Sequence, residues 1–200
     1  GNPRIRIRAR PLADWGASLP DRTWGSNHVR WMLPDFTLRM TSDVPVRFVR
    51  EETPFILAHP VHLVLGADEP LARGVAGFVR EAQERTAGYW REWVRYLSIP
   101  MDWQEAVIRS AITLKLCQYE DSGAIIAAMT TSIPEAPDTP RNWDYRYCWL
   151  RDAAFVVRAL NRLGATRSME EFLRYIFNIA TSDGSLQPLY GINFDEQLHE

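Results

Sequence analysis

The sequence has 200 residues, of which 46% are hydrophobic and 24% are charged, and this composition is typical of a globular protein rather than a disordered chain. Its formal net charge of −2 gives no electrostatic reason to expect a nucleic-acid partner. No apolar run approaches the ~18 residues of a membrane span, and no signal-peptide pattern follows Gly1, so we expect a cytoplasmic protein without a membrane partner.

The first 67 residues have the pattern of short β-strands. Residues 4–10 alternate Ile or Ala with Arg, which predicts a strand with one buried face and one solvated arginine face. A basic stripe for nucleic acid is the alternative, but the acidic overall balance favours the strand. Further apolar runs bounded by Pro, Gly or Asp predict strands at 29–33, 36–40, 44–49, 55–57 and 61–65. Short strands at this spacing predict an antiparallel β-sandwich.

His59 and His62 form the one pair of residues in this part that suggests a metal site. They lie three apart in a predicted strand, where such residues face opposite ways, and no third ligand is near in sequence. We therefore expect neither a metal nor any other cofactor. Cys117 and Cys148 are too few for a disulfide framework, and we expect two free, buried thiols.

The hydrophobic period changes at Asp68 from two to about 3.6. Pro70 suits a first helical turn, and apolar residues then recur at intervals of three and four from Val75 to Leu97. This pattern predicts one long helix over residues 69–98, with arginines and glutamates on its opposite face. Such a helix fits a connection between two domains, so we assign residues 68–101 as a linker.

The rest of the chain, residues 102–200, is predicted to be mainly helical. Asp102 with Glu105 is a capping-box pair for a helix to about residue 119, and Ser168 with Glu171 is a second pair for a helix through residue 180. Between them we expect a short buried extended run at 124–131, a proline-rich loop at 134–140, and a helix over 153–163 with Gly164 as its C-cap. Residues 183–185 are expected to end the last helix, and 186–191 to form an extended loop. Helices that each bury one face predict hairpins that close into a bundle or a toroid.

Residues 142–152, Asn-Trp-Asp-Tyr-Arg-Tyr-Cys-Trp-Leu-Arg-Asp, carry the chemistry. Indole and phenol rings offer flat apolar faces, while Arg151 and Asp152 offer hydrogen-bond donors beside a charged acceptor. A sugar needs this combination, because its C–H face packs on aromatic rings and its hydroxyls both donate and accept. The structural alternative is that the aromatic residues are core and that Asp152 is a helix N-cap.

The same stretch resembles the segment Asn-x-Asp-Tyr-x-Tyr-x-Trp-x-Arg-Asp-Ala of glycoside hydrolase family 15, which includes glucoamylases, glucodextranases and bacterial trehalases. The resemblance extends to Thr113–Leu116, Gly123–Ala128, Thr130–Glu135 and Leu186–Gly191, and it covers most of the chain. It implies an α+β multidomain protein: a β-sandwich at 1–67, a linker helix at 68–101, and the first part of an (α/α)6 toroid at 102–200. It also implies an exo-acting, inverting hydrolase that releases glucose from α-glucans or trehalose.

By that resemblance, Arg151 and Asp152 bind the hydroxyls of the terminal glucose, Tyr145 and Trp149 pack around the same ring, and Trp143 and Tyr190 line the rim. The general acid and base of this family are glutamates on later toroid helices. No position of this sequence matches their motifs, so we expect the 200 residues alone not to hydrolyse α-glucosides. A non-catalytic carbohydrate-binding protein and a disaccharide phosphorylase on a similar toroid are the alternatives. The sequence does not predict an oligomeric state.

Overall fold

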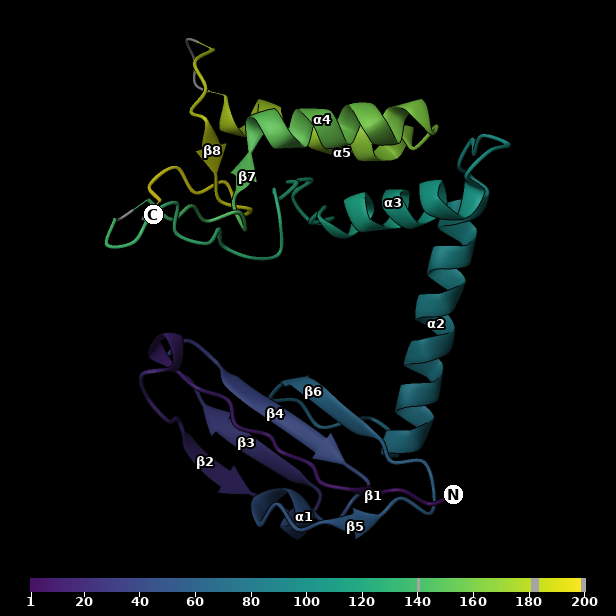
Figure 1. Cartoon of the computed structure of the whole chain (residues 1–200), viewed down its shortest axis with the longest axis vertical. Helices are drawn as coiled ribbons and strands as arrows, with labels where there is room; N and C mark the ends of the chain where they lie inside the picture. The colour runs from purple at the N-terminus through teal and green to yellow at the C-terminus, as the bar shows by residue number, and fades with distance from the viewer. Residues whose placement is uncertain (140, 181–183, 199–200) are drawn as a thin grey trace. The chain divides into compact units, whose positions relative to one another are not determined.

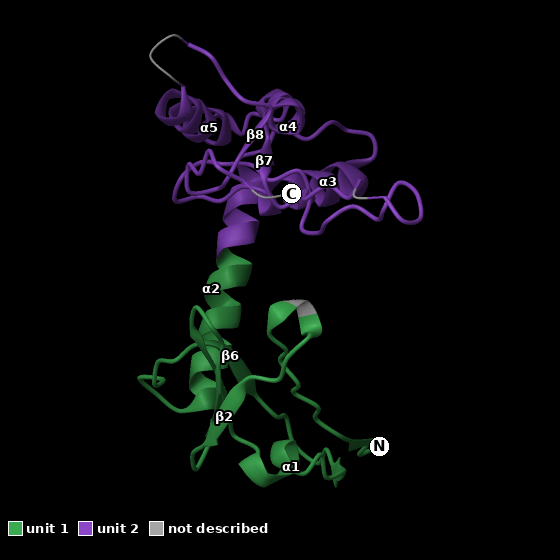
Figure 2. Ribbon diagram, turned by 90° about the vertical axis from the view of Figure 1, so that its left-hand side faces the viewer, with its two compact units in different colours: residues 1–88 green, residues 89–200 purple. Residues whose placement is uncertain are grey.

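The structure is a computed structural model, and it describes residues 1–139, 141–180 and 184–198 (Figure 1). The chain divides into an N-terminal unit, Gly1–Gly88, and a C-terminal unit, Tyr89–Glu200 (Figure 2). The main antiparallel sheet lies in the first unit, and three helices lie wholly in the second, joined by long connecting segments. The predicted succession of a β part and a helical part is therefore confirmed.

A four-stranded antiparallel sheet is the centre of the N-terminal unit, with its strands in the order β2-β3-β4-β6. These strands are β2 (Asp21–Trp24), β3 (His28–Met32), β4 (Thr37–Ser42) and β6 (Leu63–Ala67). Val29 of β3 lies opposite Met40 of β4 in the ladder, and both side chains are buried with Trp31. A separate two-stranded ladder pairs β1 (Arg4–Ile5) with β5 (Phe55–Ile56).

Two predictions in this unit need correction. Residues 44–49 form no strand: Pro45 is the N-cap of helix α1 (Val46–Arg50), and Val49 packs into the core beside Val29, Trp31 and Met40. The apolar spacing here satisfies both a period of two and a helical face, and burial of Val49 decides for the helix. The predicted strand 4–10 shortens to β1, although Ile7 and Ala9 still pack on the core. A short 3-10 helix (Asp14–Gly16) and strand β2 were not predicted.

The long helix is present but begins later than predicted. Helix α2 spans Val75–Arg95, so Pro70 lies before its first turn. Asp68 explains the delay, because its carboxylate binds Arg30 and Arg39 of the sheet and thereby holds the preceding chain to strands β3 and β4. Among the described residues, no helix is both long enough and apolar enough to cross a membrane.

Three helices build the C-terminal unit beyond α2: α3 (Gln104–Leu116), α4 (Leu150–Arg162) and α5 (Thr166–Ile179). Helices α4 and α5 form an antiparallel hairpin at Gly164. The C-cap of α4 is Leu163, and the predicted cap residue Gly164 follows one position later with a φ of +82°, where glycine is favoured. The last helix ends at Ile179. Asp183, which was expected to help end it, and Pro140 of the proline-rich loop lie outside the described residues.

Both predicted capping boxes are wrong. The N-cap of α3 is Trp103, in the left-handed conformation with φ +58°, and the helix ladder starts at its carbonyl, which leaves Asp102 one residue too early. Helix α5 begins at Thr166, so Ser168 lies inside it and is buried. The carboxylate of Glu171, expected to reach back to the backbone, instead binds the side chain of Gln118.

Candidate functional site

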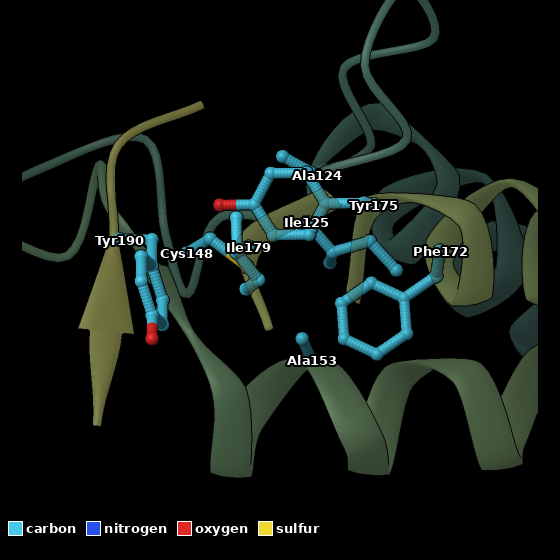
Figure 3. Close-up of a cluster of buried hydrophobic side chains, with 8 residues drawn as sticks. All are labelled: Ala124, Ile125, Cys148, Ala153, Phe172, Tyr175, Ile179 and Tyr190. Atoms are coloured by element: carbon cyan, nitrogen blue, oxygen red, sulfur yellow. The ribbon is translucent and has the colours of Figure 1, made fainter. Parts of the chain in front are cut away.

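The aromatic stretch 142–152 joins helix α4 through the short strand β7 (Cys148–Trp149). Cys148 and Ala153 are fully buried and anchor this junction in one hydrophobic cluster. Figure 3 shows the cluster, whose other members are Ala124, Ile125, Phe172, Tyr175, Ile179 and Tyr190. Because successive strand residues point to opposite sides, burial of Cys148 turns Trp149 away from this core. Trp149 is half-buried and Arg151 is exposed.

Backbone hydrogen bonds bring two distant segments to this stretch. Strand β7 pairs antiparallel with β8 (Leu189–Tyr190), and the amide of Leu150 donates to the carbonyl of Pro188 at 3.0 Å. On the other side, the amide of Ala128 donates to the carbonyl of Tyr145 at 2.8 Å, and the amide of Ser132 donates to Trp143 at 2.7 Å. Segments 124–132 and 186–191 therefore frame the aromatic stretch.

A shallow hollow of about 410 Å³ lies beside Trp143 and Tyr145. The indole Nε1 of Trp143 donates to Glu135 Oε1 at 3.0 Å, and the hydroxyl of Ser132 accepts the Trp143 amide at 2.8 Å. These bonds fix the ring of Trp143 at the wall. The other residues of the wall are Thr131, Ser132, Ile133, Pro134 and Glu135.

Arg151 and Asp152 lie side by side in the first turn of α4. Arg151 Nη2 donates to Asp152 Oδ2 at 3.0 Å, and the guanidinium carbon lies 6.0 Å from the centre of the Trp149 ring. The N-cap of the helix is Trp149, and no side chain caps it. Asp152 therefore does not serve as the N-cap, and its carboxylate, 37% exposed, faces solvent beside a guanidinium that is 73% exposed.

Asp144 stabilises the loop before this turn. Its carboxylate accepts two bonds from the Arg146 guanidinium, at 2.9 and 2.7 Å, and these bonds lower the pKa of Asp144 below its ordinary value. The carbonyl of Asp144 accepts the indole N–H of Trp149 at 2.9 Å. Trp149 is thereby held against the loop that carries Trp143 and Tyr145, so the two parts of the aromatic stretch are linked.

Comparison with known proteins decides the family. Residues 102–197, which include the aromatic stretch and both framing segments, match the family described as glycosyl hydrolases family 15. This segment places the chain in glycosyl hydrolase family 15. The resemblance noted from the residues alone is confirmed.

The relatives of this family 15 chain include several proteins named trehalase. That of Mycolicibacterium smegmatis is 32% identical over 173 residues, which cover 82% of this chain and 26% of the relative. Those of Thermoplasma volcanium and Mycobacterium tuberculosis are each 38% identical, over 58% of this chain and 19% or 18% of their own length. The chain thus spans about a fifth to a quarter of these relatives. No solved structure matches it significantly.

Tyr190 of this family 15 chain does not occupy the expected rim. Its side chain is 1% exposed and belongs to the hydrophobic cluster, because strand β8 pairs with β7 and places Tyr190 opposite the buried Cys148. Its hydroxyl accepts the amide of Gln187 at 2.8 Å and so shapes the loop that precedes it.

Tyr175 on α5 was not singled out from the sequence. It is fully buried, its hydroxyl donates to the Gly191 carbonyl at 2.8 Å, and burial raises its pKa. The helical spacing of its neighbours predicts only that Tyr175 packs in the core. A tyrosine at a buried position also needs a hydrogen-bond partner for its hydroxyl, and this was the one signal of the bond to Gly191.

The site as described combines a flat indole, a donor group and an acceptor at the start of one helix. Trp149, Arg151 and Asp152 supply these three parts, and Trp143 and Tyr145 line the neighbouring hollow. Among the described residues, no three His, Cys, Asp or Glu side chains gather in a way that could hold a metal ion. The arrangement is suited to binding and orienting a polyhydroxylated ring.

Proposed function

We propose that this chain carries the glucose-binding side of a family 15 glycoside hydrolase that acts on trehalose. The observation that carries the proposal is the Asp152 carboxylate, which serves no helix cap and binds Arg151, whose guanidinium lies near the ring of Trp149. The names of the relatives support trehalose as the substrate. The proposal includes exo-acting hydrolysis with inversion, and extends to the terminal glucose of α-glucans, which presents the same ring.

In this proposal each residue has one task. Asp152 accepts hydrogen bonds from glucose hydroxyls, Arg151 donates to them, and Trp149 packs on the C–H face of the ring. Tyr145 completes that packing, while Trp143, at the wall of the hollow, contacts the second sugar. These contacts orient the glycosidic bond toward the acid and base that cleave it.

We assign no catalytic carboxylate within the chain. An inverting hydrolase needs one carboxylic acid that is protonated near neutral pH and one carboxylate that activates water. The arginine contact keeps Asp144 ionised, which is the opposite of what a proton donor requires. Asp152 accepts a hydrogen bond from Arg151, and the proposal assigns it to substrate binding.

The domain plan belongs to the same proposal. Residues 1–67 would form part of a β-sandwich, residues 68–101 a linker, and residues 102–200 the start of an (α/α)6 toroid. The antiparallel sheet order and the α4–α5 hairpin support it, since these are the building units of such folds.

The test is the substitution Asp152→Asn, measured as kcat/KM for trehalose in the whole protein. Asparagine keeps the size of the side chain but removes the charge, and loss of a charge-assisted bond of about 1.5–3 kcal/mol lowers kcat/KM by roughly 10- to 150-fold. The melting temperature should hardly change, because the carboxylate caps no backbone group.

Asp102→Asn, at an exposed position before α3, is the matched control and should leave kcat/KM unchanged. Full activity in Asp152→Asn would overturn the assignment. Binding of trehalose by the wild-type protein without any release of glucose would instead support a carbohydrate-binding protein that does not hydrolyse.

A further inference from the structure

A second cavity, of about 640 Å³, lies within the C-terminal unit, away from the aromatic stretch. Its walls come from the end of α2, from α3 and the turn after it, and from the turn between α4 and α5. Its volume lies in the range of small-molecule sites. The residues that line it are Tyr89, Glu92, Trp93, Tyr96, Leu97, Lys115, Glu120 and Gly164–Ser168.

Three aromatic side chains of α2 and its C-terminal end form one wall. Tyr89, Trp93 and Tyr96 follow one another at intervals of four and three, so they share one side of the helix. Tyr89 is 42% exposed and Tyr96 is 74% exposed. Large aromatic residues exposed around a cavity offer flat apolar faces to a ligand.

A buried ammonium group also lines the cavity. The side chain of Lys115 is only 6% exposed, and its Nζ donates to Gln118 Oε1 at 2.9 Å and to Glu120 Oε1 at 2.7 Å. An ammonium has three protons, and no described residue accepts the third. A buried donor without an acceptor is costly, so a ligand oxygen at this place would be stabilised.

Glu120 provides the complementary acceptor. Its Oε1 already accepts both Lys115 and the hydroxyl of Tyr89, at 2.7 and 2.5 Å. Its Oε2 has no hydrogen-bond partner among the described residues, and the side chain is 52% exposed. A donor on Lys115 and an acceptor on Glu120, close enough to bond each other, match two neighbouring hydroxyl groups of one ligand.

The charges around the cavity exclude an anion as the preferred ligand. Lys115 and Arg167 are balanced by Glu92 and Glu120, and the guanidinium of Arg167 binds Glu171 at 2.7 Å. With no excess positive charge, the cavity has no field that would attract a phosphate group. A neutral ligand rich in hydroxyls suits the cavity.

We propose that this cavity is a second saccharide-binding site, in which Tyr96 and Trp93 pack on a sugar ring and Lys115 and Glu120 bind two adjacent hydroxyls. The site goes beyond the proposed hydrolysis and does not depend on it. Gln118, which accepts from Lys115 and donates to Glu171 Oε2 at 3.0 Å, holds the ammonium in position from behind.

The experiment is a calorimetric titration of the whole protein with glucose in an Asp152→Asn background, in which the site at the aromatic stretch is weakened. Saturable binding should remain. Adding Tyr96→Ala should weaken it by roughly 2- to 10-fold, because an aromatic contact contributes about 0.5–1.5 kcal/mol. Tyr96 is exposed, so its removal should not affect folding.

Phe177→Ala, which removes an aromatic ring that is 79% exposed on α5 and lines no part of this cavity, is the matched control and should leave binding unchanged. Tyr89→Phe, which removes one hydroxyl contact of Glu120, provides a second variant that keeps the ring. The proposal is overturned if Tyr96→Ala and Tyr89→Phe both bind glucose as the background does, or if inorganic phosphate displaces glucose. Loss of activity in Asp152→Asn is measured separately, so failure of one proposal does not conceal failure of the other.

Discussion

Two glutamates, one in each unit, bind arginine in different surroundings. Glu52 of the N-terminal unit, whose side chain is 24% exposed, accepts two bonds from Arg10, at 2.6 and 2.8 Å, and lies 3.3 Å from Arg8. It has no buried side-chain partner among the described residues. Glu171 of the C-terminal unit has a side chain that is 10% exposed, and it binds both Arg167 and the buried Gln118.

The difference shows which contacts stabilise each unit. Exposed ion pairs contribute little to stability, so the N-terminal unit depends on the register of its sheet and on the cluster around Trp31. In the C-terminal unit a chain of buried polar groups runs from Lys115 through Gln118 to Glu171 and ties α3 to α5. Matched substitutions in the two units should therefore have unequal effects.

The largest difference is expected between two glycines. Gly123 has a φ of +87°, and a Cβ there would lie 2.2 Å from the carbonyl oxygen of Glu171, whereas a Cβ on Gly66 of β6 would meet nothing within 4 Å. Gly123→Ala should lower the free energy of unfolding by roughly 2–4 kcal/mol, from backbone strain and overpacking together. Gly66→Ala should be neutral or slightly stabilising. Urea denaturation followed by circular dichroism measures both, and equal midpoints would contradict the comparison.

The second difference concerns the cations. Lys115→Met keeps the length of the side chain but leaves the buried Gln118 Oε1 without its donor, and should lower the free energy of unfolding by about 1–3 kcal/mol. Arg10→Met also removes two charge-assisted bonds, but at an exposed position, and should change stability little. Urea denaturation measures both variants. A greater loss of unfolding free energy in Arg10→Met than in Lys115→Met would show that the buried network is not the more stabilising of the two.

The smallest effect should appear in acid. Bonds from Lys115 and Tyr89 lower the pKa of Glu120 below its ordinary value of 4.5 in the folded protein. The stabilisation is therefore complete above pH 4.5 and is lost as the pH falls through the lowered pKa. The melting temperature of Glu120→Gln should fall less between pH 5 and pH 3 than that of the wild type.

Glu84→Gln, at an exposed position of α2 in the N-terminal unit, serves as the control and should follow the wild-type curve. Parallel curves for Glu120→Gln and the wild type would show that the contact with Lys115 does not contribute to stability.

Periodicity predicted the parts of the fold in which one face of an element is buried. Strands β3 and β4, and helices α2, α4 and α5, lie near their predicted places because their apolar residues face a core. Element ends were less predictable. Trp103, rather than Asp102, caps α3, and the Asp68 contacts with Arg30 and Arg39 delay α2, because both outcomes depend on tertiary contacts that a local pattern does not contain.

The candidate site shows the same division. Trp149, Arg151 and Asp152 were predicted together because they are adjacent in sequence, and the structure keeps them in contact. The burial of Tyr190 could not be predicted, because it follows from pairing between β7 and β8. The bond from Gln118 to Glu171 could not be predicted either, since the two residues lie far apart in sequence and meet only when α5 packs beside the end of α3.

The ladder between β7 and β8 has a consequence for the order of folding. Trp149 pairs with Leu189, so the strand that completes the aromatic stretch arrives only after the whole α4–α5 hairpin has been traversed. Closing a loop of about 40 residues is slow compared with forming a helix, because the entropy of closure precedes the contacts that offset it. During synthesis, residues 142–152 leave the ribosome well before Tyr190 does, so β7 cannot pair with β8 until the chain has been extended past Tyr190. The aromatic stretch is therefore among the last parts of this unit to acquire its shape.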